Sequence, residues 1–340
     1  MLTKQALPGY TGFSDIVTNQ GTLRNYGFEA EVRANIINKG GFTWDMNANI
    51  SSVANKIISL PYNGVDKNRV GGYEVAAGKV GADGKFPTKW IAGRQEGGKL
   101  GELVAYKQQH IFKDWDDVKQ HANMRIDEVA NLYGPGLADQ INPLTNKPYK
   151  ESTGWQPIEP GDVCWEDMNG DDVINGYDRY VVGNIFPNIT GGFSTTFGYK
   201  GISLYARFDY ALGHTLYNDL AARSLGQYQG SFNVIDKVKD TWSEANPNSD
   251  LPKFYYADQL SKKNITRSND SNTAADSNSS RFYEKGDYLA LREITLSYQL
   301  PKSLISKVHM TDASVYVTGQ NLFYITGYEG VSPEPVVSTT

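Results

Sequence analysis

The stretch from Asp167 to Asp178 spaces its oxygen-bearing residues in the way that a calcium-binding loop does. By loop position, the candidate ligands are Asp167 at 1, Asn169 at 3, Asp171 at 5, Val173 through its backbone carbonyl at 7, Asn175 at 9 and Asp178 at 12. A hard cation needs about six to eight oxygen ligands, and alternate residues of a short turn place them on one side. The pattern therefore predicts that this loop holds a structural Ca²⁺ ion.

The loop departs from the usual calcium pattern at two positions. Asp172 stands at position 6, where glycine normally makes the sharp turn, although Gly170 and Gly176 are close enough to relieve strain. Asp178 is shorter than the usual glutamate, which makes bidentate closure harder. No helical pattern flanks the loop as in an EF-hand, and Ile174 at position 8 is expected to anchor the turn to the structure beneath it. The alternative is an acidic Asn-Gly turn that binds no ion.

The sequence contains no motif for a disulfide, for a histidine metal site or for catalysis. Cys164 is the only cysteine, so no disulfide forms within the chain, and we expect a structural thiol. The four histidines, which have no metal-ligand spacing along the chain, are His110, His121, His214 and His309. Zinc-protease, nucleophile-elbow, P-loop and dinucleotide-binding motifs do not occur, and no carboxylate pair has a spacing that marks catalysis. The protein is therefore predicted not to be an enzyme.

Composition narrows the class of protein. The 340 residues carry a net charge of -5, which is too mild for a nucleic-acid-binding protein. Hydrophobic residues make up 39%, yet there are 22 tyrosines and 34 glycines. This balance suits a β protein with large polar loops, and it also suits a transmembrane β-barrel, where alternate residues face lipid. The N-terminus has no apolar signal region, so for a secreted or outer-membrane protein we expect the true start to lie outside this sequence.

Strands are the elements expected to position the candidate ligands. Alternating apolar and polar residues, the mark of β-strands, recur along the chain. The pattern predicts strands near 27–37, 42–50, 190–199, 202–212, 288–300 and 313–325. The first two, 27–37 and 42–50, are about 9–11 residues long, the length of tilted strands that cross a bilayer. Arg207 and Asp209 fall on the polar face of one strand, where we expect a salt bridge lining a wet channel; direct contact with substrate is the alternative.

Two long segments, 51–187 and 213–286, interrupt the alternation. In them we expect a strand near 99–106, a helix from Asp114 to Tyr133 capped by Asp114, a short amphipathic helix near Val234 to Ala245, and a Ser/Asn/Asp-rich stretch over 261–280. Loop aromatics could stack on sugar rings or could simply anchor the loops; they include Trp90, Trp115, Trp155 and Tyr228.

The order is strand, short turn, strand, long loop, three times over. Short turns on one side and long loops on the other are typical of outer-membrane β-barrels. Six strands cannot close a barrel alone, since bacterial single-chain barrels start at eight. The predicted fold class is therefore all-β: part of a transmembrane antiparallel β-barrel, about six or seven strands here, with long extracellular loops.

Short blocks along nearly the whole chain resemble one family. They are Thr11-Gly-Phe13, Asn19-Gln-Gly21, Asn25-Tyr-Gly-Phe-Glu29, Phe42-Thr-Trp44, Asn55-Lys-Ile57, Glu96-Gly97, Leu100-Gly101, the calcium-like loop continuing through Arg179, Val182-Gly-Asn184, Pro187 and Gly191-Gly-Phe193, then Tyr199-Lys-Gly201, Leu291-Arg-Glu-Ile-Thr-Leu-Ser-Tyr298, Pro301, Gly319-Gln-Asn-Leu-Phe323 and Gly327-Tyr328. In this order they resemble the C-terminal part, residues 1–340 here, of a SusC/RagA-type TonB-linked outer-membrane transporter.

The resemblance implies a barrel of 22 strands whose plug domain and last strand are absent from this chain. It also implies a SusD-like surface lipoprotein as partner, the TonB complex acting through the missing N-terminal part, and a glycan or peptide as cargo. We expect a location in the outer membrane, with lipid around the strands and loops facing the cell exterior. The alternatives are a calcium-dependent extracellular glycan-binding module and a TonB-linked transporter for siderophores or cobalamin.

Overall fold

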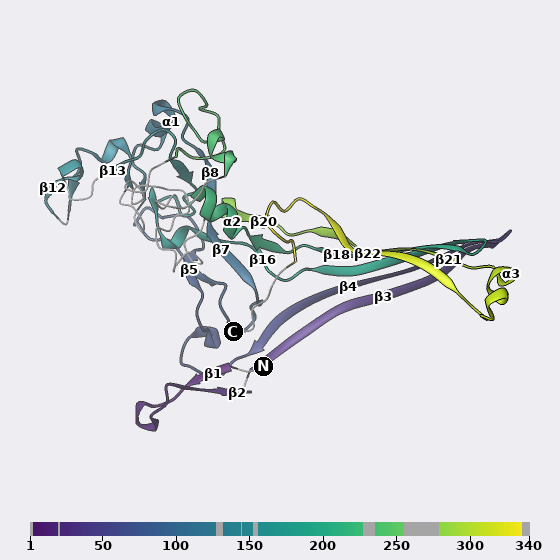
Figure 1. The fold of residues 1–340 in the computed structure, drawn as a ribbon. Helices are drawn as coiled ribbons and strands as arrows, with labels where there is room; N and C mark the ends of the chain where they lie inside the picture. The colour runs from purple at the N-terminus through teal and green to yellow at the C-terminus, as the bar shows by residue number, and fades with distance from the viewer. Residues whose placement is uncertain are drawn as a thin grey trace. The chain divides into compact units, whose positions relative to one another are not determined.

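The computed structural model describes residues 3–19, 21–126, 132–143, 145–151, 156–226, 235–254 and 279–334 (Figure 1). The chain divides into two compact units, and each is described by itself. The first unit comprises Met1–Gly21, Ser59–Gly183 and Tyr217–Glu284, and the second comprises Thr22–Ile58, Asn184–Leu216 and Lys285–Thr340. Trp155 and Tyr228, and all of the 261–280 stretch except its last two residues, lie outside the described residues.

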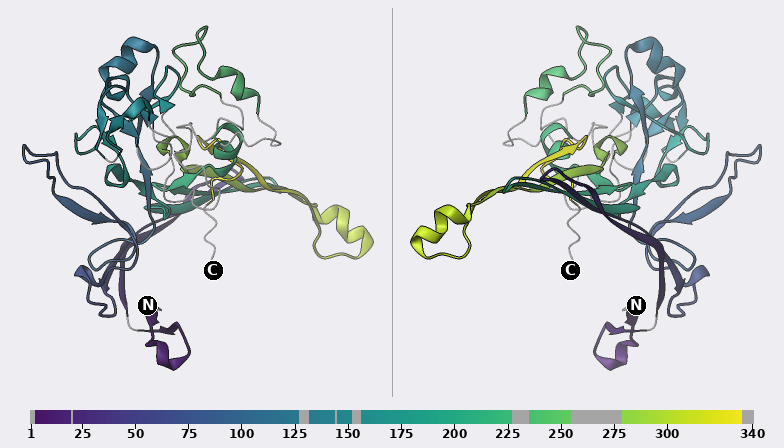
Figure 2. Two further views of the ribbon diagram at one scale, coloured as in Figure 1. Left: turned by 90° about the vertical axis from the view of Figure 1, so that its left-hand side faces the viewer. Right: turned by 90° about the vertical axis from the view of Figure 1, so that its right-hand side faces the viewer.

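The second unit is one twisted sheet of six strands (Figures 1 and 2). The strands are β3 (Thr22–Lys39), β4 (Phe42–Ser59), β17 (Ile189–Tyr199), β18 (Ile202–Leu212), β21 (Tyr288–Gln299) and β22 (Ser314–Thr326). Their order in the sheet is β22-β21-β18-β17-β4-β3, so each strand lies beside its neighbours in sequence, and β3 and β22 form open edges among the described strands. A strand occurs at each predicted position, and β3 and β4 are longer than predicted, at 18 residues each.

The strands are joined at one end of the sheet by three short connections (Figure 1). Gly40 and Gly41 have φ of 64° and 79°, and Lys200 and Gly201 have φ of 47° and 88°. Two residues in succession with positive φ form the tight turn that suits the twist of a hairpin, and glycine adopts this conformation without strain. The third connection contains the short helices α3 (Lys302–Ile305) and η10 (Ser306–Val308).

The register of the sheet collects apolar side chains on one face. We call this set the apolar face; its members include Trp44, Met46, Phe193, Phe197, Leu204, Phe208, Leu296, Val317 and Phe323. Phe193 stacks on Phe208 across β17 and β18 with ring centres 4.7 Å apart. Leu296 lies opposite Leu204 on one side and Val317 on the other, and the exposed fractions of Leu296 and Val317 are 53% and 74%. The apolar face is therefore continuous across the sheet, and its side chains range from half-buried, as in Phe193 and Phe208, to exposed, as in Leu296 and Val317.

The first unit consists of short elements. Its strands are β1 (Thr3–Ala6), β2 (Asp15–Thr18), β5 (Tyr73–Ala76), β6 (Thr88–Ile91), β7 (Glu102–Tyr106), β8 (Gln108–Ile111), β9 (Arg125–Ile126), β10 (Leu132–Tyr133), β11 (Ile141–Asn142), β12 (Lys147–Pro148), β13 (Gln156–Pro157), β14 (Val163–Trp165) and β15 (Val173–Ile174). Strands at or across the unit boundaries are β16 (Arg179–Asn184), β19 (Thr215–Tyr217) and β20 (Tyr283–Lys285). Helical turns are η1 (Gly9–Thr11), η2 (Asp66–Asn68), α1 (Trp115–Gln120), η3 (Pro135–Leu137), η4 (Tyr149–Glu151), η5 (Gly176–Asp178), α2 (Asp219–Ala221), η6 (Ala222–Gly226), η7 (Asp236–Asp240) and η9 (Ser280–Phe282).

The helix predicted from Asp114 to Tyr133 is wrong beyond its first turns. Asp114 does cap α1, accepting hydrogen bonds from the N–H groups of Asp116 and Asp117, both at 2.9 Å. The helix ends at Gln120, because 125–126 and 132–133 pair with each other and with β13 and β15 in a small sheet. The helix predicted near 234–245 is likewise a single 3-10 turn, η7, over the described part of that range.

A hydrophobic core fills the first unit. Its buried members include Phe112, Val118, Ile126, Leu132, Val163, Cys164, Trp165, Ile174 and Trp242. Three of the apolar positions that suggested one long helix, Val118, Ile126 and Leu132, are indeed buried, but they reach the core from α1, β9 and β10, and Trp115 is exposed. No helix within the described segments combines the length and the apolar character that a membrane span requires.

Candidate functional site

The calcium-like loop, Asp167–Asp178, is fixed to the core of the first unit. It begins after β14 and is followed by β16, so no long helix flanks it, as expected. Ile174 is fully buried in the hydrophobic core, which confirms its predicted anchoring role. β15 pairs with β9, and Arg125 donates its backbone N–H to the carbonyl of Asp172 at 2.8 Å. The loop is therefore anchored to the core by a buried side chain and by backbone pairing.

Side-chain oxygens of the predicted ligands turn toward the interior of the loop. Asp167 accepts hydrogen bonds from the N–H groups of Gly170 at 2.6 Å and Asp172 at 2.8 Å. Asp171 accepts from the N–H of Val173 at 2.9 Å and from the side-chain amide of Asn169 at 3.0 Å. These hydrogen bonds keep the side chains at loop positions 1, 3 and 5 on the inner side of the loop.

Asp178 closes the loop from position 12. Its two carboxylate oxygens accept the N–H groups of Met168 and Asn175, each at 2.8 Å, and its side chain is fully buried. Burial raises the pKa of Asp178 to about 6, the two backbone hydrogen bonds oppose this, and the nearby charges of Asp167 and Asp171 add to it. In the described part of the chain, no lysine or arginine side chain forms an ion pair with this carboxylate.

The unusual residue at position 6 adopts the conformation that glycine normally supplies. Asp172 has φ of 62°, in the left-handed region that aspartate tolerates better than most residues. Gly170 shares the sharp turn with φ of 76°, whereas Gly176 starts the 3-10 turn η5. The departure at position 6 therefore leaves the loop path intact.

The donor set fits a hard cation. The carboxylates of Asp167 and Asp171 lie close enough to Asp178 to raise its pKa. Asn169, in the same loop, is also fully buried. A buried carboxylate without a cationic partner is costly, and a divalent cation would offset that cost. The loop would supply oxygens from Asp167, Asn169, Asp171 and Asp178, with Val173 held in β15 and Asn175 at the cap of η5. A Ca²⁺ ion at this position remains a proposal.

The polar face of the sheet carries an ion cluster that differs from the prediction. Asp209 pairs with Arg292, whose Nε lies 3.0 Å from Oδ2, and not with Arg207. The β21 strand bulges between Leu291 and Glu293, and this bulge carries the Arg292 guanidinium. Arg292 also donates to the hydroxyl of Tyr324 at 3.2 Å and pairs with Glu334. Sequence spacing could not show this pairing because it depends on a bulge.

Loop aromatics fall into two environments. The guanidinium of Arg69 lies 3.9 Å above the ring centre of Trp90, so Trp90 packs against its own loop. Trp115, in contrast, is 50% exposed and lines a cleft of about 660 Å³ together with Trp242, Lys113, Glu159 and other residues. This cleft is a place in the first unit where an aromatic ring faces solvent beside charged groups.

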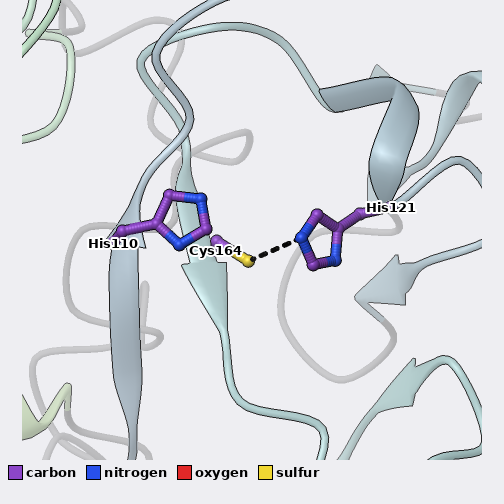
Figure 3. A group of neighbouring side chains, drawn as sticks. All are labelled: His110, His121 and Cys164. Carbon is purple, nitrogen blue, oxygen red and sulfur yellow. Dashed lines mark hydrogen bonds between the residues drawn. The ribbon is translucent and has the colours of Figure 1, made fainter. Parts of the chain in front are cut away.

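A second group of metal-ligand side chains lies in the first unit and was missed by sequence spacing. His110 comes from β8, His121 follows α1, and Cys164 belongs to β14 (Figure 3). One ligand atom from each of the three lies within 4.8 Å of the other two. Burial raises the pKa of the Cys164 thiol to about 12. Intervals of 11 and 43 residues gave no signal for this cluster along the chain.

Comparisons with known proteins show that the chain is similar to TonB-dependent receptors along nearly its whole length. No family model matches it. It is 26% identical over 334 residues to TonB-dependent receptor P3 and 27% identical over 345 residues to TonB-dependent receptor P39, both from Formosa agariphila. Each match covers 98% of this chain, and the chain spans 27% and 30% of the length of these two relatives. The resemblance drawn from the sequence is confirmed by these relatives.

Solved structures show the same fold. The RagAB peptide transporter matches with a TM-score of 0.60, and the RagAB peptide importer in its open-open state matches with 0.61, each at 19% identity. The matches cover 99% of this chain and 29% of those chains. These matches confirm the predicted all-β fold class, since the same fold forms part of the matched transporter chains.

Proposed function

We propose that this chain forms part of the wall and the loops of a TonB-dependent outer-membrane importer. The observation that carries the proposal is the apolar face of the six-stranded sheet. Its side chains align across at least five strands and are half-buried or exposed, while the opposite face carries Thr, Ser, Asn and the Arg292 cluster. A water-soluble protein rarely exposes so continuous an apolar surface, whereas lipid covers it in a barrel wall.

Adjacent residues of β21 provide a matched test of this assignment. Leu296 lies on the apolar face opposite Leu204 and Val317, and Ser297 lies on the polar face opposite Ser203 and Tyr316. In the full-length importer, Leu296→Arg should place a cation in lipid and cost up to about 2–4 kcal/mol, depending on depth. Ser297→Arg adds the same charge toward the lumen and should be tolerated.

The measurement is the amount of heat-modifiable protein in outer-membrane fractions, run with and without boiling. We expect a clear loss for Leu296→Arg and near wild-type amounts for Ser297→Arg. Equal tolerance of both substitutions would contradict a lipid-facing role for the apolar face. If the wild-type protein were also soluble without detergent, the calcium-dependent glycan-binding module would become the better interpretation.

We also propose that the importer takes up oligosaccharides or oligopeptides together with a SusD-like surface lipoprotein, with energy supplied by the TonB complex. The match to a peptide transporter supports uptake of an oligomeric nutrient. The cleft beside the half-exposed ring of Trp115 supports a saccharide contact, because an aromatic face packs well on a sugar ring. Uptake of labelled peptide and glycan mixtures by cells with and without the intact gene would distinguish the two cargo classes.

The proposed Ca²⁺ would be structural. It would fix the loop 167–178 so that the first unit presents a constant surface to the lipoprotein partner. We expect Asp167→Ala combined with Asp171→Ala to lower the order of the loop and the affinity for the partner, while heat modifiability of the barrel stays unchanged. Partner affinity can be measured by pull-down from detergent-solubilised membranes; an unchanged affinity in the double variant would refute this role.

A further inference from the structure

We propose that His110, His121 and Cys164 form a Zn²⁺ site in the first unit, separate from the calcium-like loop. The three residues come from β8, from the end of α1 and from β14, segments that are distant in sequence. Figure 3 shows the thiol of Cys164 lying between the two imidazole rings. Nothing in the proposed importer function requires this cluster.

The distances are close to those of a zinc centre. The Nε2 atom of His121 lies 3.8 Å from the Sγ of Cys164. In a tetrahedral site with Zn–N of about 2.0–2.1 Å and Zn–S of about 2.3 Å, a nitrogen and a sulfur ligand are about 3.6 Å apart. The ligand atoms of all three residues already lie within 4.8 Å of one another, so each pair must approach by no more than about 1.5 Å to reach tetrahedral zinc geometry.

An outer contact orients the first histidine. Both carboxylate oxygens of Asp117 lie 3.2 Å from the Nε2 of His110, and Asp117 also accepts the backbone N–H of Lys113 at 3.0 Å. A carboxylate on one ring nitrogen fixes the proton there and leaves the lone pair on the other, the arrangement found behind metal-bound histidines. Nδ1 of His110 is therefore the nitrogen available to the metal.

The sulfur and nitrogen donor atoms of these side chains favour Zn²⁺ over the common divalent ions Ca²⁺ and Mg²⁺. One thiol and two imidazoles suit Zn²⁺, whereas Ca²⁺ and Mg²⁺ prefer oxygen. Without metal, the Cys164 thiol lies 3.6 Å from the side-chain carbonyl of Gln109, to which it can donate. Zinc binding would replace this contact, release the thiol proton and leave the fourth coordination position to water. The side chain of His110 is 37% exposed, which gives the ion a route from solvent.

Cobalt substitution of the full-length importer tests the proposal. Protein purified in detergent without a histidine tag and stripped with a chelator would be titrated with Co²⁺. We expect an intense near-ultraviolet charge-transfer band from a cobalt–thiolate bond, lost on addition of Zn²⁺ at one equivalent per chain. Cys164→Ser should abolish the band, and His121→Asn should abolish it or lower the Co²⁺ affinity by more than tenfold. Asp117→Asn should weaken Zn²⁺ binding about 10- to 100-fold without abolishing it.

His309→Asn is the matched control. His309 is exposed in the turn between β21 and β22 and has φ of 59°, which asparagine tolerates, so its replacement should leave the band unchanged. Heat-modifiable mobility would verify that each variant is folded. The proposal is overturned if folded wild-type protein shows no thiolate band with Co²⁺, or if the band persists in Cys164→Ser.

Discussion

The buried carboxyl of Asp178 should make the stability of the calcium-like loop depend on pH in the absence of metal. Its pKa is about 6 in the folded loop, against an ordinary value of 3.8. A difference of about two pKa units corresponds to about 3 kcal/mol. Between pH 3.8 and 6 the closed loop binds more protons than the opened loop, so the free energy of opening falls as pH rises through this window and levels off above it. The penalty is therefore fully present at pH 7.

Hydrogen exchange of peptides that cover 167–178 measures this free energy in the full-length importer. After correction for the intrinsic pH dependence of exchange, protection in chelator should fall by about two orders of magnitude between pH 4 and 7. This ratio is the factor that about 3 kcal/mol implies. Calcium at pH 7 should restore protection, because a divalent cation favours the charged carboxylates of Asp167, Asp171 and Asp178.

Asp178→Asn is the control for this experiment. Its amide keeps the size of the side chain but has no charge to bury, so both the pH dependence and most of the calcium response should disappear. Exchange in β18, which lies in the other unit, should respond to neither variable. A flat pH profile in the wild-type loop would refute the assignment of the burial penalty to Asp178, and a loop that ignores calcium would refute the metal site.

Two further predictions follow from single side chains. Ile174→Ala removes a fully buried anchor of the loop and should destabilise the first unit by about 2–5 kcal/mol, seen as faster proteolysis of the loop region with unchanged heat modifiability. Arg292→Ala leaves Asp209 and Glu334 without their cation and should cost about 1.5–3 kcal/mol, lowering the temperature at which heat-modifiable mobility is lost. Arg207→Ala, on the same face, should have a smaller effect, and equal effects would contradict the pairing of Asp209 with Arg292.

Features that depend on neighbouring residues could be predicted from the sequence. Strands follow from an alternation of period two, and the tight hairpin turns follow from Gly40-Gly41 and Lys200-Gly201, since both signals lie within a few residues. The spacing of the calcium-like loop is equally local, and the burial of Ile174 agrees with its position in that pattern. Even the blocks that resemble TonB-linked transporters are short runs in a fixed order.

Features that join distant segments depend on how the chain packs in three dimensions. Val118, Ile126 and Leu132 have helical spacing and are all buried, but the pairing of β9 with β10 and β15 ends the helix at Gln120. Asp209 selects Arg292 because a bulge in β21 carries that side chain to it. The cluster of His110, His121 and Cys164 exists because three elements pack around one core. The order of the residues sets which side chains are apolar, which turns are tight and which oxygens share one loop. Which distant groups meet depends on packing and strand register, because these bring together residues that have no fixed interval along the chain.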